Sequence, residues 1–219
     1  MRLTKTVLLL LLLAFAIGLF LISRPLTPVG PALVANTPVD RAAAELQSAV
    51  VVGSNWDGTA EVFDPESFAI LARYNLVPDI EERFAEINDS LYRRIAARFI
   101  RTVIGEGNDQ LVDDLFPSKD GRYLFVSRPS FADAIALDVT TGKIAWRTKV
   151  KGVRSDHAAL SPDGKIFLIS ASTGGVVHAI DTATGDIVDN FYPGDQPHES
   201  NYSKDGQRIY HASIGRVFV

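Results

Sequence analysis

The chain repeats one turn signal three times, as Ser118-Lys119-Asp120-Gly121, Ser161-Pro162-Asp163-Gly164 and Ser203-Lys204-Asp205-Gly206. The turn aspartates are 43 and then 42 residues apart, and each turn precedes a short run rich in β-forming residues. A second signal keeps this spacing, because Ala136-Leu137-Asp138-Val139-Thr140-Thr141-Gly142 returns as Ala179-Ile180-Asp181-Thr182-Ala183-Thr184-Gly185. A repeat of about 40–45 residues with several short strands in each unit is typical of a β-propeller.

The acidic residues of these signals are interpreted as turn formers and not as a set of catalytic carboxylates. An aspartate side chain bonds the backbone just after it, and glycine takes the positive φ that a tight turn requires. The predicted structural turn residues are Asp120, Gly121, Asp138, Gly142, Asp163, Gly164, Asp181, Gly185, Asp205 and Gly206.

Each full repeat has one strand before the Asp-Gly turn, one after it, a third ending at Ala-x-Asp and a fourth after the Thr-Gly turn. Four strands per unit make a propeller blade. Three more strands are predicted earlier, at Val50–Gly53, Thr59–Phe63 and Ala69–Leu76, and the last unit stops unfinished at Val219.

We therefore expect an all-β fold over residues 49–219, an incomplete propeller of about three and a half blades. Because a propeller closes with roughly four to eight blades, the sequence is interpreted as the N-terminal portion of a longer protein. If the chain is complete at residue 219, two chains would have to associate to close the ring.

The N-terminus carries a membrane signal. Arg2 and Lys5 precede a charge-free apolar run from Val7 to Ile22, shorter than the roughly 20 residues of a comfortable membrane span. We expect residues 1–23 to be a signal-anchor transmembrane helix, with a cleaved signal peptide as the alternative. Either reading places the bulk of the chain in the periplasm or outside the cell. The proline-rich residues 24–48 are predicted to be an extended spacer.

Residues 78–108 interrupt the β pattern. Apolar residues recur there at three- and four-residue steps, which predicts a helical insertion that the blades do not need for folding. Asp79 with Glu82 reads as a capping box, and Asn88-Asp89-Ser90 is a point where the helix could break. The second half of the insertion is basic, which indicates either a solvated face or a docking surface for an anionic partner or lipid headgroups. That candidate surface consists of Arg93, Arg94, Arg98 and Arg101.

Composition excludes several classes of function. The chain has no cysteine, so it holds no disulfide, thiolate metal site or lipoprotein anchor. Its formal net charge of −4 argues against nucleic-acid binding. No phosphate-binding loop or Ser-His-Asp arrangement can be assembled from the spacings, so no catalytic residue, metal ligand or cofactor is predicted.

The stretch from Ala136 to Trp146 resembles the Ala-x-Asp-x-x-Thr-Gly-Lys-x-x-Trp blade motif of quinoprotein-like propellers with PQQ-like repeats. The next unit is similar to the YVTN repeat of bacterial extracytoplasmic propellers, and it has Asp189 where the first has Trp146. The resemblance implies that Trp146 docks on a neighbouring blade. It says little about activity, because members include dehydrogenases, lactonases and scaffolds. The cysteine pair of the quinone-cofactor dehydrogenases is absent.

The candidate ligand site lies just before two of the turns. His157 and His198 are 41 residues apart at the start of consecutive repeats, with Asp156 and Glu199 beside them. Such residues usually belong to the innermost strand of a blade, so both imidazoles are expected near one mouth of the channel. This arrangement suits metal coordination or proton transfer, or simply hydrogen bonds between blades.

Two functions remain open at this point. The first is a membrane-anchored extracytoplasmic scaffold that binds a protein or a small molecule without catalysis of its own. The alternative is part of a propeller enzyme, a quinoprotein-like oxidoreductase or a lactonase-like hydrolase, whose active site is completed by blades beyond residue 219.

Overall fold

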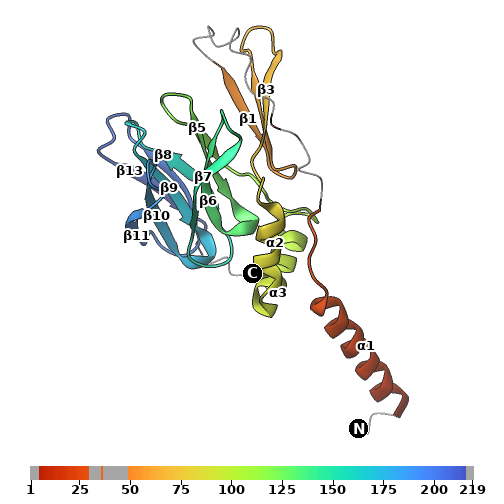
Figure 1. Cartoon of the computed structure of the whole chain (residues 1–219). Coiled ribbons are helices and arrows are strands. Elements are labelled where there is room, and N and C mark those ends of the chain that lie inside the picture. The colour runs from red at the N-terminus through yellow and green to blue at the C-terminus, as the bar shows by residue number, and fades with distance from the viewer. Residues whose placement is uncertain (1–4, 30–35, 37–48, 216–219) are drawn as a thin grey trace.

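The computed structural model describes residues 5–29, 36 and 49–215, and strands predominate in them. These strands form two four-stranded sheets, one three-stranded sheet and one two-stranded sheet, each with antiparallel pairing between neighbours in sequence. The sheets follow one another along the chain as successive blades (Figure 1). The chain therefore has a β-propeller-like fold, as the repeats predict.

The strand boundaries follow the predicted turns closely. The first sheet contains β1 (Val50–Ser54), β2 (Thr59–Phe63) and β3 (Ile70–Asn75). The second contains β4 (Leu115–Pro117), β5 (Tyr123–Arg128), β6 (Asp133–Asp138) and β7 (Lys143–Lys149). The third contains β8 (Ala158–Leu160), β9 (Ile166–Ala171), β10 (Val176–Asp181) and β11 (Ile187–Phe191). The fourth contains β12 (Pro197–Tyr202) and β13 (Ile209–Ser213). One-turn 3-10 helices at Pro129–Phe131 (η3) and Ser172–Gly174 (η4) join β5 to β6 and β9 to β10.

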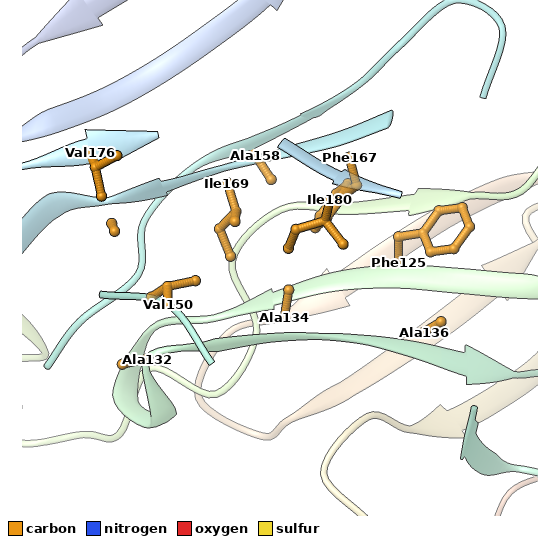
Figure 2. Packing of buried hydrophobic residues seen from close by; sticks show 11 residues of the cluster. Phe125, Ala132, Ala134, Ala136, Val150, Ala158, Phe167, Ile169, Val176 and Ile180 are labelled. Carbon is orange, nitrogen blue, oxygen red and sulfur yellow. The ribbon is translucent and has the colours of Figure 1, made fainter. Parts of the chain in front are cut away.

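The second sheet is buried on both faces. Successive side chains of a strand point to opposite faces, so Leu124 and Val126 join the core shared with the first sheet while Phe125 joins the core shared with the third. Figure 2 shows the second of these cores, where Phe125 from β5 lies near Phe167 and Ile180 of the third sheet. This packing explains why these strands read as continuous apolar runs.

Trp146 of β7 joins the second and third sheets. Its indole N–H donates to the backbone oxygen of Thr182 at 2.9 Å, and its ring stacks on Phe125 with centroids 5.9 Å apart. Docking on a neighbouring blade, implied by the resemblance, is thus confirmed.

The N-terminal helix α1 (Lys5–Ser23) projects away from the sheets (Figure 1). Its described apolar side chains from Val7 onward are largely exposed. Within the described part of the chain, no helix combines the length and the apolar character needed to cross a membrane, so the transmembrane helix predicted for residues 1–23 is not supported by this finding.

The predicted insertion folds as three consecutive helical segments. They are α2 (Ile80–Asn88), α3 (Leu91–Phe99) and a π-helical continuation η2 (Ile100–Ile104). The predicted break at 88–90 is present, and the Ser90 hydroxyl accepts the Arg93 N–H. The capping box is not formed, because Asp79 precedes α2 without capping it through its side chain.

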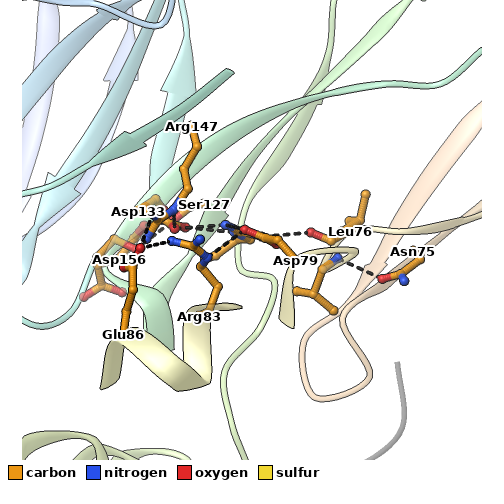
Figure 3. Close-up of polar contacts among 12 residues, drawn as sticks. Asn75, Leu76, Asp79, Arg83, Glu86, Ser127, Asp133, Arg147 and Asp156 are labelled. Carbon is orange, nitrogen blue, oxygen red and sulfur yellow. Dashed lines mark hydrogen bonds and ion pairs between the residues drawn. The ribbon is translucent and has the colours of Figure 1, made fainter. Parts of the chain in front are cut away.

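Asp79 instead binds an arginine from the second sheet. The Arg128 guanidinium, at the end of β5, is fully buried and contacts Asp79 Oδ1 at 2.6 Å and Asp133 Oδ1 at 2.8 Å. Arg83 and Glu86 of α2 extend this ion-pair network to Arg147 of β7 (Figure 3). Removal of one carboxylate from a buried arginine lowers the free energy of unfolding by several kcal/mol. The insertion is therefore tied into the blade, which argues against the expectation that the blades can fold without it.

The insertion also packs through its apolar face and against the start of the predicted spacer. Phe84 and Ile87 of α2 share a core with Leu26, Leu111 and Phe131. Leu26 in addition exchanges hydrogen bonds with the Asn88 side chain, its N–H donating at 2.8 Å and its carbonyl accepting at 2.9 Å. Residues 24–29 therefore lie on the insertion and are not a free linker. The rest of the predicted spacer, apart from residue 36, is outside the described residues, as are residues 1–4 and 216–219.

Candidate functional site

The candidate site is built on the strands that open three successive sheets. β8 contacts both β4 and β12, so the residues just before these strands come close together. Backbone hydrogen bonds fix them: the Asp156 N–H donates to the Ser170 oxygen at 2.8 Å, and the Ser170 N–H donates to the His157 oxygen at 3.0 Å. The equivalent residues Asp113 and Asp114 bond Ser127 in the same way, both at 2.9 Å. These side chains therefore project from rigid backbone.

Five titratable side chains meet there, and we call them the histidine–aspartate cluster. The rings of His157 and His198 lie edge to face with centroids 4.5 Å apart. His157 Nδ1 is 3.1 Å from Asp114 Oδ2, and His198 Nδ1 is 3.3 Å from Asp156 Oδ2. Asp113 completes the group, with its Oδ2 3.9 Å from His157 Nδ1. Each histidine thus pairs with an aspartate from the preceding sheet.

One cation balances part of this negative charge. Arg154 Nη1 donates to Asp156 Oδ2 at 2.8 Å, and the same guanidinium donates to Gln110 Oε1 at 3.1 and 3.2 Å. With neutral imidazoles, three carboxylates therefore face one guanidinium, and the cluster with its arginine carries a net charge of −2.

The electrostatics of the cluster shift three pKa values. The hydrogen bond to Asp114 is the main cause that raises the pKa of His157 to about 9. Burial raises the pKa of Asp113 above its usual range. Burial acts in the same direction on Asp114, but the bonds from His157 and the Ala158 N–H outweigh it, so the pKa of Asp114 is lowered. At neutral pH, His157 is therefore a protonated imidazolium beside the ionised carboxylate of Asp114.

The cluster opens on a cleft of about 860 Å³. Asp156 and His198 line it together with Arg154, and the insertion contributes the side chains of Phe99 and Ile104 to the lining. A concave site that combines apolar walls with a few convergent polar groups is the usual form of a ligand pocket.

The predicted site is brought together only in part. Asp156, His157 and His198 do meet, as the repeat spacing indicates. Glu199 does not belong to the cluster: it is exposed and accepts a hydrogen bond from Asn201 Nδ2 at 2.9 Å. It follows His198 on a strand, where neighbouring side chains point to opposite faces.

Sequence reasoning missed Asp113, Asp114 and Arg154. A signal for the two aspartates exists in the repeat, because Asp113 and Asp114 precede the turn residue Asp120 by seven and six positions. Asp156 and His157 occupy the same two positions before their own turn aspartate, as do His198 and Glu199 in the next unit. Arg154 has no such counterpart in the repeat pattern.

The basic face of the insertion is largely engaged within the chain. Arg94 donates to the Ser23 oxygen at 2.6 Å, and Arg98 donates to the Arg24 oxygen at the end of α1. Arg101 binds Asp109 and the Thr27 oxygen, each through contacts of 2.8 or 2.9 Å. The predicted docking surface is thereby reduced, since three of its four arginines hold the segment that leaves α1.

Comparison with known proteins supports a fold for this chain but identifies no family. No protein family matches the chain, and no curated protein matches it. Among solved structures, the chain is similar to the hydrazine synthase of Kuenenia stuttgartiensis, with 25% identity and a TM-score of 0.43 over 47% of this chain and 29% of that one. It is also similar to a chain of a mitotic checkpoint complex, with 14% identity and a TM-score of 0.53 over 75% of this chain and 43% of that one. The chain thus spans less than half the length of either, and the second likeness supports the β-propeller-like fold alone.

Proposed function

We propose that this chain is part of a membrane-held extracytoplasmic binding protein, a propeller of the YVTN and PQQ-like type, with its ligand site at the histidine–aspartate cluster. One observation carries the proposal: titratable side chains from three successive sheets meet in one cluster, and two of them, Asp156 and His198, line a cleft. Convergence of this kind, on backbone fixed by strand hydrogen bonds, is expected of a binding site on a rigid scaffold.

The chemistry of the cleft favours a ligand with a positively charged group beside an apolar part. With His157 protonated at neutral pH, the three carboxylates, Arg154 and His157 still carry a net charge of −1, which attracts a cation. Phe99 and Ile104 offer apolar surface within the same cleft. An organic amine, free or on a peptide side chain, has this character.

A thermal-shift series with organic amines tests this function. The purified chain, kept in a metal chelator, is expected to melt at a higher temperature with aliphatic or aromatic amines than with carboxylates of the same size, because binding to the folded state stabilises it. Asp113→Asn should reduce the shift, while the exposed Asp189→Asn should not. Equal shifts with amines and carboxylates would reject the proposal.

The pairing of His157 with Asp114 favours a second candidate, the enzyme alternative. A carboxylate that orients an imidazole is the arrangement used in general acid–base catalysis. A lactonase-like hydrolase would open small lactones at a rate that falls by about 10²-fold or more in His157→Gln. If the unmodified chain and His157→Gln open lactones at the same rate, the hydrolase is rejected and the binding scaffold is retained.

Attachment to a membrane is proposed from α1 and its junction with the insertion. The helix exposes apolar side chains along its described length, and Arg94 and Arg98 bond the carbonyls of its last residue, Ser23, and of Arg24 just after it. Such contacts would place the sheets close to a bilayer that receives α1. The absence of cysteine allows a direct test with single introduced cysteines. Lys204→Cys, in the turn before β13, should react with a membrane-impermeant maleimide in spheroplasts, and Thr4→Cys should react only after lysis. If Lys204→Cys does not react until the cells are lysed, the proposed topology is wrong.

A further inference from the structure

We propose that the histidine–aspartate cluster binds one divalent transition-metal ion through His157, His198 and Asp156. This inference deepens the proposed function and rests on it, because the ion would lie at the same cleft. Each of the three residues offers one ligand atom, and these atoms all lie within 4.8 Å of one another. In a tetrahedral zinc site with bonds of about 2.0–2.1 Å, ligand atoms are roughly 3.4 Å apart. Small side-chain rotations are enough to close that difference.

The two aspartates that are not ligands, Asp113 and Asp114, lie where they can orient His157 for metal binding. Asp114 Oδ2 accepts from His157 Nδ1 and also from the Ala158 N–H at 2.8 Å. A carboxylate that holds one ring nitrogen of a histidine fixes the ring and leaves Nε2 for the metal, the usual arrangement around metal-bound histidines. Asp113 adds a further carboxylate next to His157.

The charge of the site matches a divalent cation. Among the described residues, Arg154 is the guanidinium that faces the three carboxylates, so the cluster has two uncompensated negative charges when both imidazoles are neutral, as metal ligands must be. Arg154 stays on Asp156 through a single 2.8 Å contact and is anchored on its other side by Gln110. A divalent ion would neutralise the remaining charge without displacing the arginine from Gln110.

The donor types indicate which metals fit. Two imidazoles and a carboxylate suit Zn²⁺, Co²⁺, Ni²⁺ or Cu²⁺, while Ca²⁺ and Mg²⁺ prefer sites made of oxygen alone. Three protein ligands leave one or two positions for water or for a ligand. Because His198 and Asp156 line the cleft, such an open position would face it.

A cobalt titration tests the site on the purified full-length chain after removal of metals by chelation. We expect Co²⁺ to produce visible absorption that saturates at one ion per chain and that Zn²⁺ abolishes. His157→Gln and His198→Gln should each weaken Co²⁺ binding by at least about ten-fold. Both side chains are partly exposed, at 31% and 37%, so these substitutions are expected to keep the fold, and circular-dichroism melting checks this.

His211→Gln is the matched control. His211 bonds the Ser200 hydroxyl at 2.8 Å and is not part of the cluster. It should bind Co²⁺ like the unmodified chain. The absence of saturable Co²⁺ absorption would overturn the metal site, as would Co²⁺ binding by His157→Gln and His198→Gln that is as tight as in the unmodified chain. The amine series in chelator separates the two proposals: amine stabilisation without Co²⁺ binding rejects only the metal, and Co²⁺ binding without amine stabilisation rejects only the organic cation as ligand.

Discussion

At the scale of single residues, the three Asp-Gly turns share one hydrogen-bond pattern. In the second turn, Asp163 Oδ1 accepts from the Ser161 hydroxyl at 2.6 Å and from the Lys165 N–H at 3.1 Å. Asp120 and Asp205 are bonded by their own serines at the same distance of 2.6 Å. These bonds confirm the interpretation of the turn aspartates as structural residues. Hydrogen bonds to the ionised form, chiefly from the serine hydroxyl, lower the pKa of each of the three carboxyls.

Removal of one serine hydroxyl should shift one of these titrations. In Ser161→Ala we expect the pKa of Asp163 to rise toward its usual value of 3.8, since the largest cause of the lowering is gone. A carboxyl with a lowered pKa stabilises the fold above its unfolded pKa, and this contribution is lost as the pH falls through the folded value. The variant should therefore lose less stability on acidification below about pH 4. Carbon-13 NMR titration of the aspartate carboxyls measures the shift, with Asp205 as the internal control. An unchanged Asp163 would contradict this assignment.

The Asp-x-x-Thr-Gly turns contain one exception to their glycine rule. Gly142 and Gly185 have φ of +65° and +80°, and Phe68 holds the equivalent position in the first sheet with φ of +57°. A side chain in this left-handed region costs roughly 1–2 kcal/mol, and Phe68 is 74% exposed, so its ring contributes little packing.

Phe68→Gly is therefore expected to stabilise the chain by about 0.5–1 kcal/mol, after allowance for the greater freedom of glycine in the unfolded chain. Gly185→Ala is the opposite control, because a Cβ there would lie 2.7 Å from Trp146 Cγ as well as at positive φ. It should cost about 2 kcal/mol or more. Chemical denaturation measures both changes. A loss of stability in Phe68→Gly would show that the ring makes contacts that its exposure does not reveal.

At the scale of secondary-structure elements, strands and helices that carry a clear periodicity are predicted well from the sequence, whereas side-chain contacts between distant segments are predicted poorly. The repeat places every strand of the two four-stranded sheets, and the three- and four-residue apolar spacing finds α2 and α3 with their break near Ser90. The role of Asp79 was mispredicted because its partner Arg128 is 49 residues away and has no mark in the local pattern. Glu199 was misplaced because its pairing with a histidine in sequence says nothing about which face of β12 it occupies. Asp114 was predictable from the repeat alone, since it occupies the position of His157 one unit earlier.

The ion pairs of Arg128 make the insertion energetically part of the second sheet. Asp79→Ala should therefore destabilise the chain by about 3–5 kcal/mol, because it leaves the buried guanidinium with one of its two carboxylates, Asp133. Glu81→Ala, in the first turn of α2 but exposed to solvent, should change the free energy of unfolding by less than about 0.5 kcal/mol. Urea unfolding followed by circular dichroism compares the two. Equal effects in both variants would mean that the insertion and the sheet unfold independently.

At the scale of the whole molecule, the inner and outer sheets differ in how well they are covered. The second and third sheets are packed on both faces, and their central strands are almost entirely buried. The outer sheets expose apolar side chains instead, with Val50 and Val52 on β1 and Ile209 and Tyr210 on β13. At about 25 cal/mol per Å² of apolar area, several hundred Å² of such surface correspond to roughly 10 kcal/mol of burial still to be gained. That amount is comparable to the whole stability of a domain, roughly 5–15 kcal/mol.

Self-association through these outer sheets is therefore expected for residues 41–219 in isolation. Strands at the ends of the array also offer unpaired backbone groups to another chain. Light scattering should show dimers or larger assemblies at micromolar concentration. Tyr210→Lys, which places a charge on the exposed face of β13 where Tyr210 is 59% accessible, should shift the population toward monomer, and Lys204→Ala in the preceding turn should leave it unchanged. A monodisperse, cooperatively melting monomer of the unmodified 41–219 chain would show that the outer sheets are stable in water as they are, and the expected self-association would be wrong.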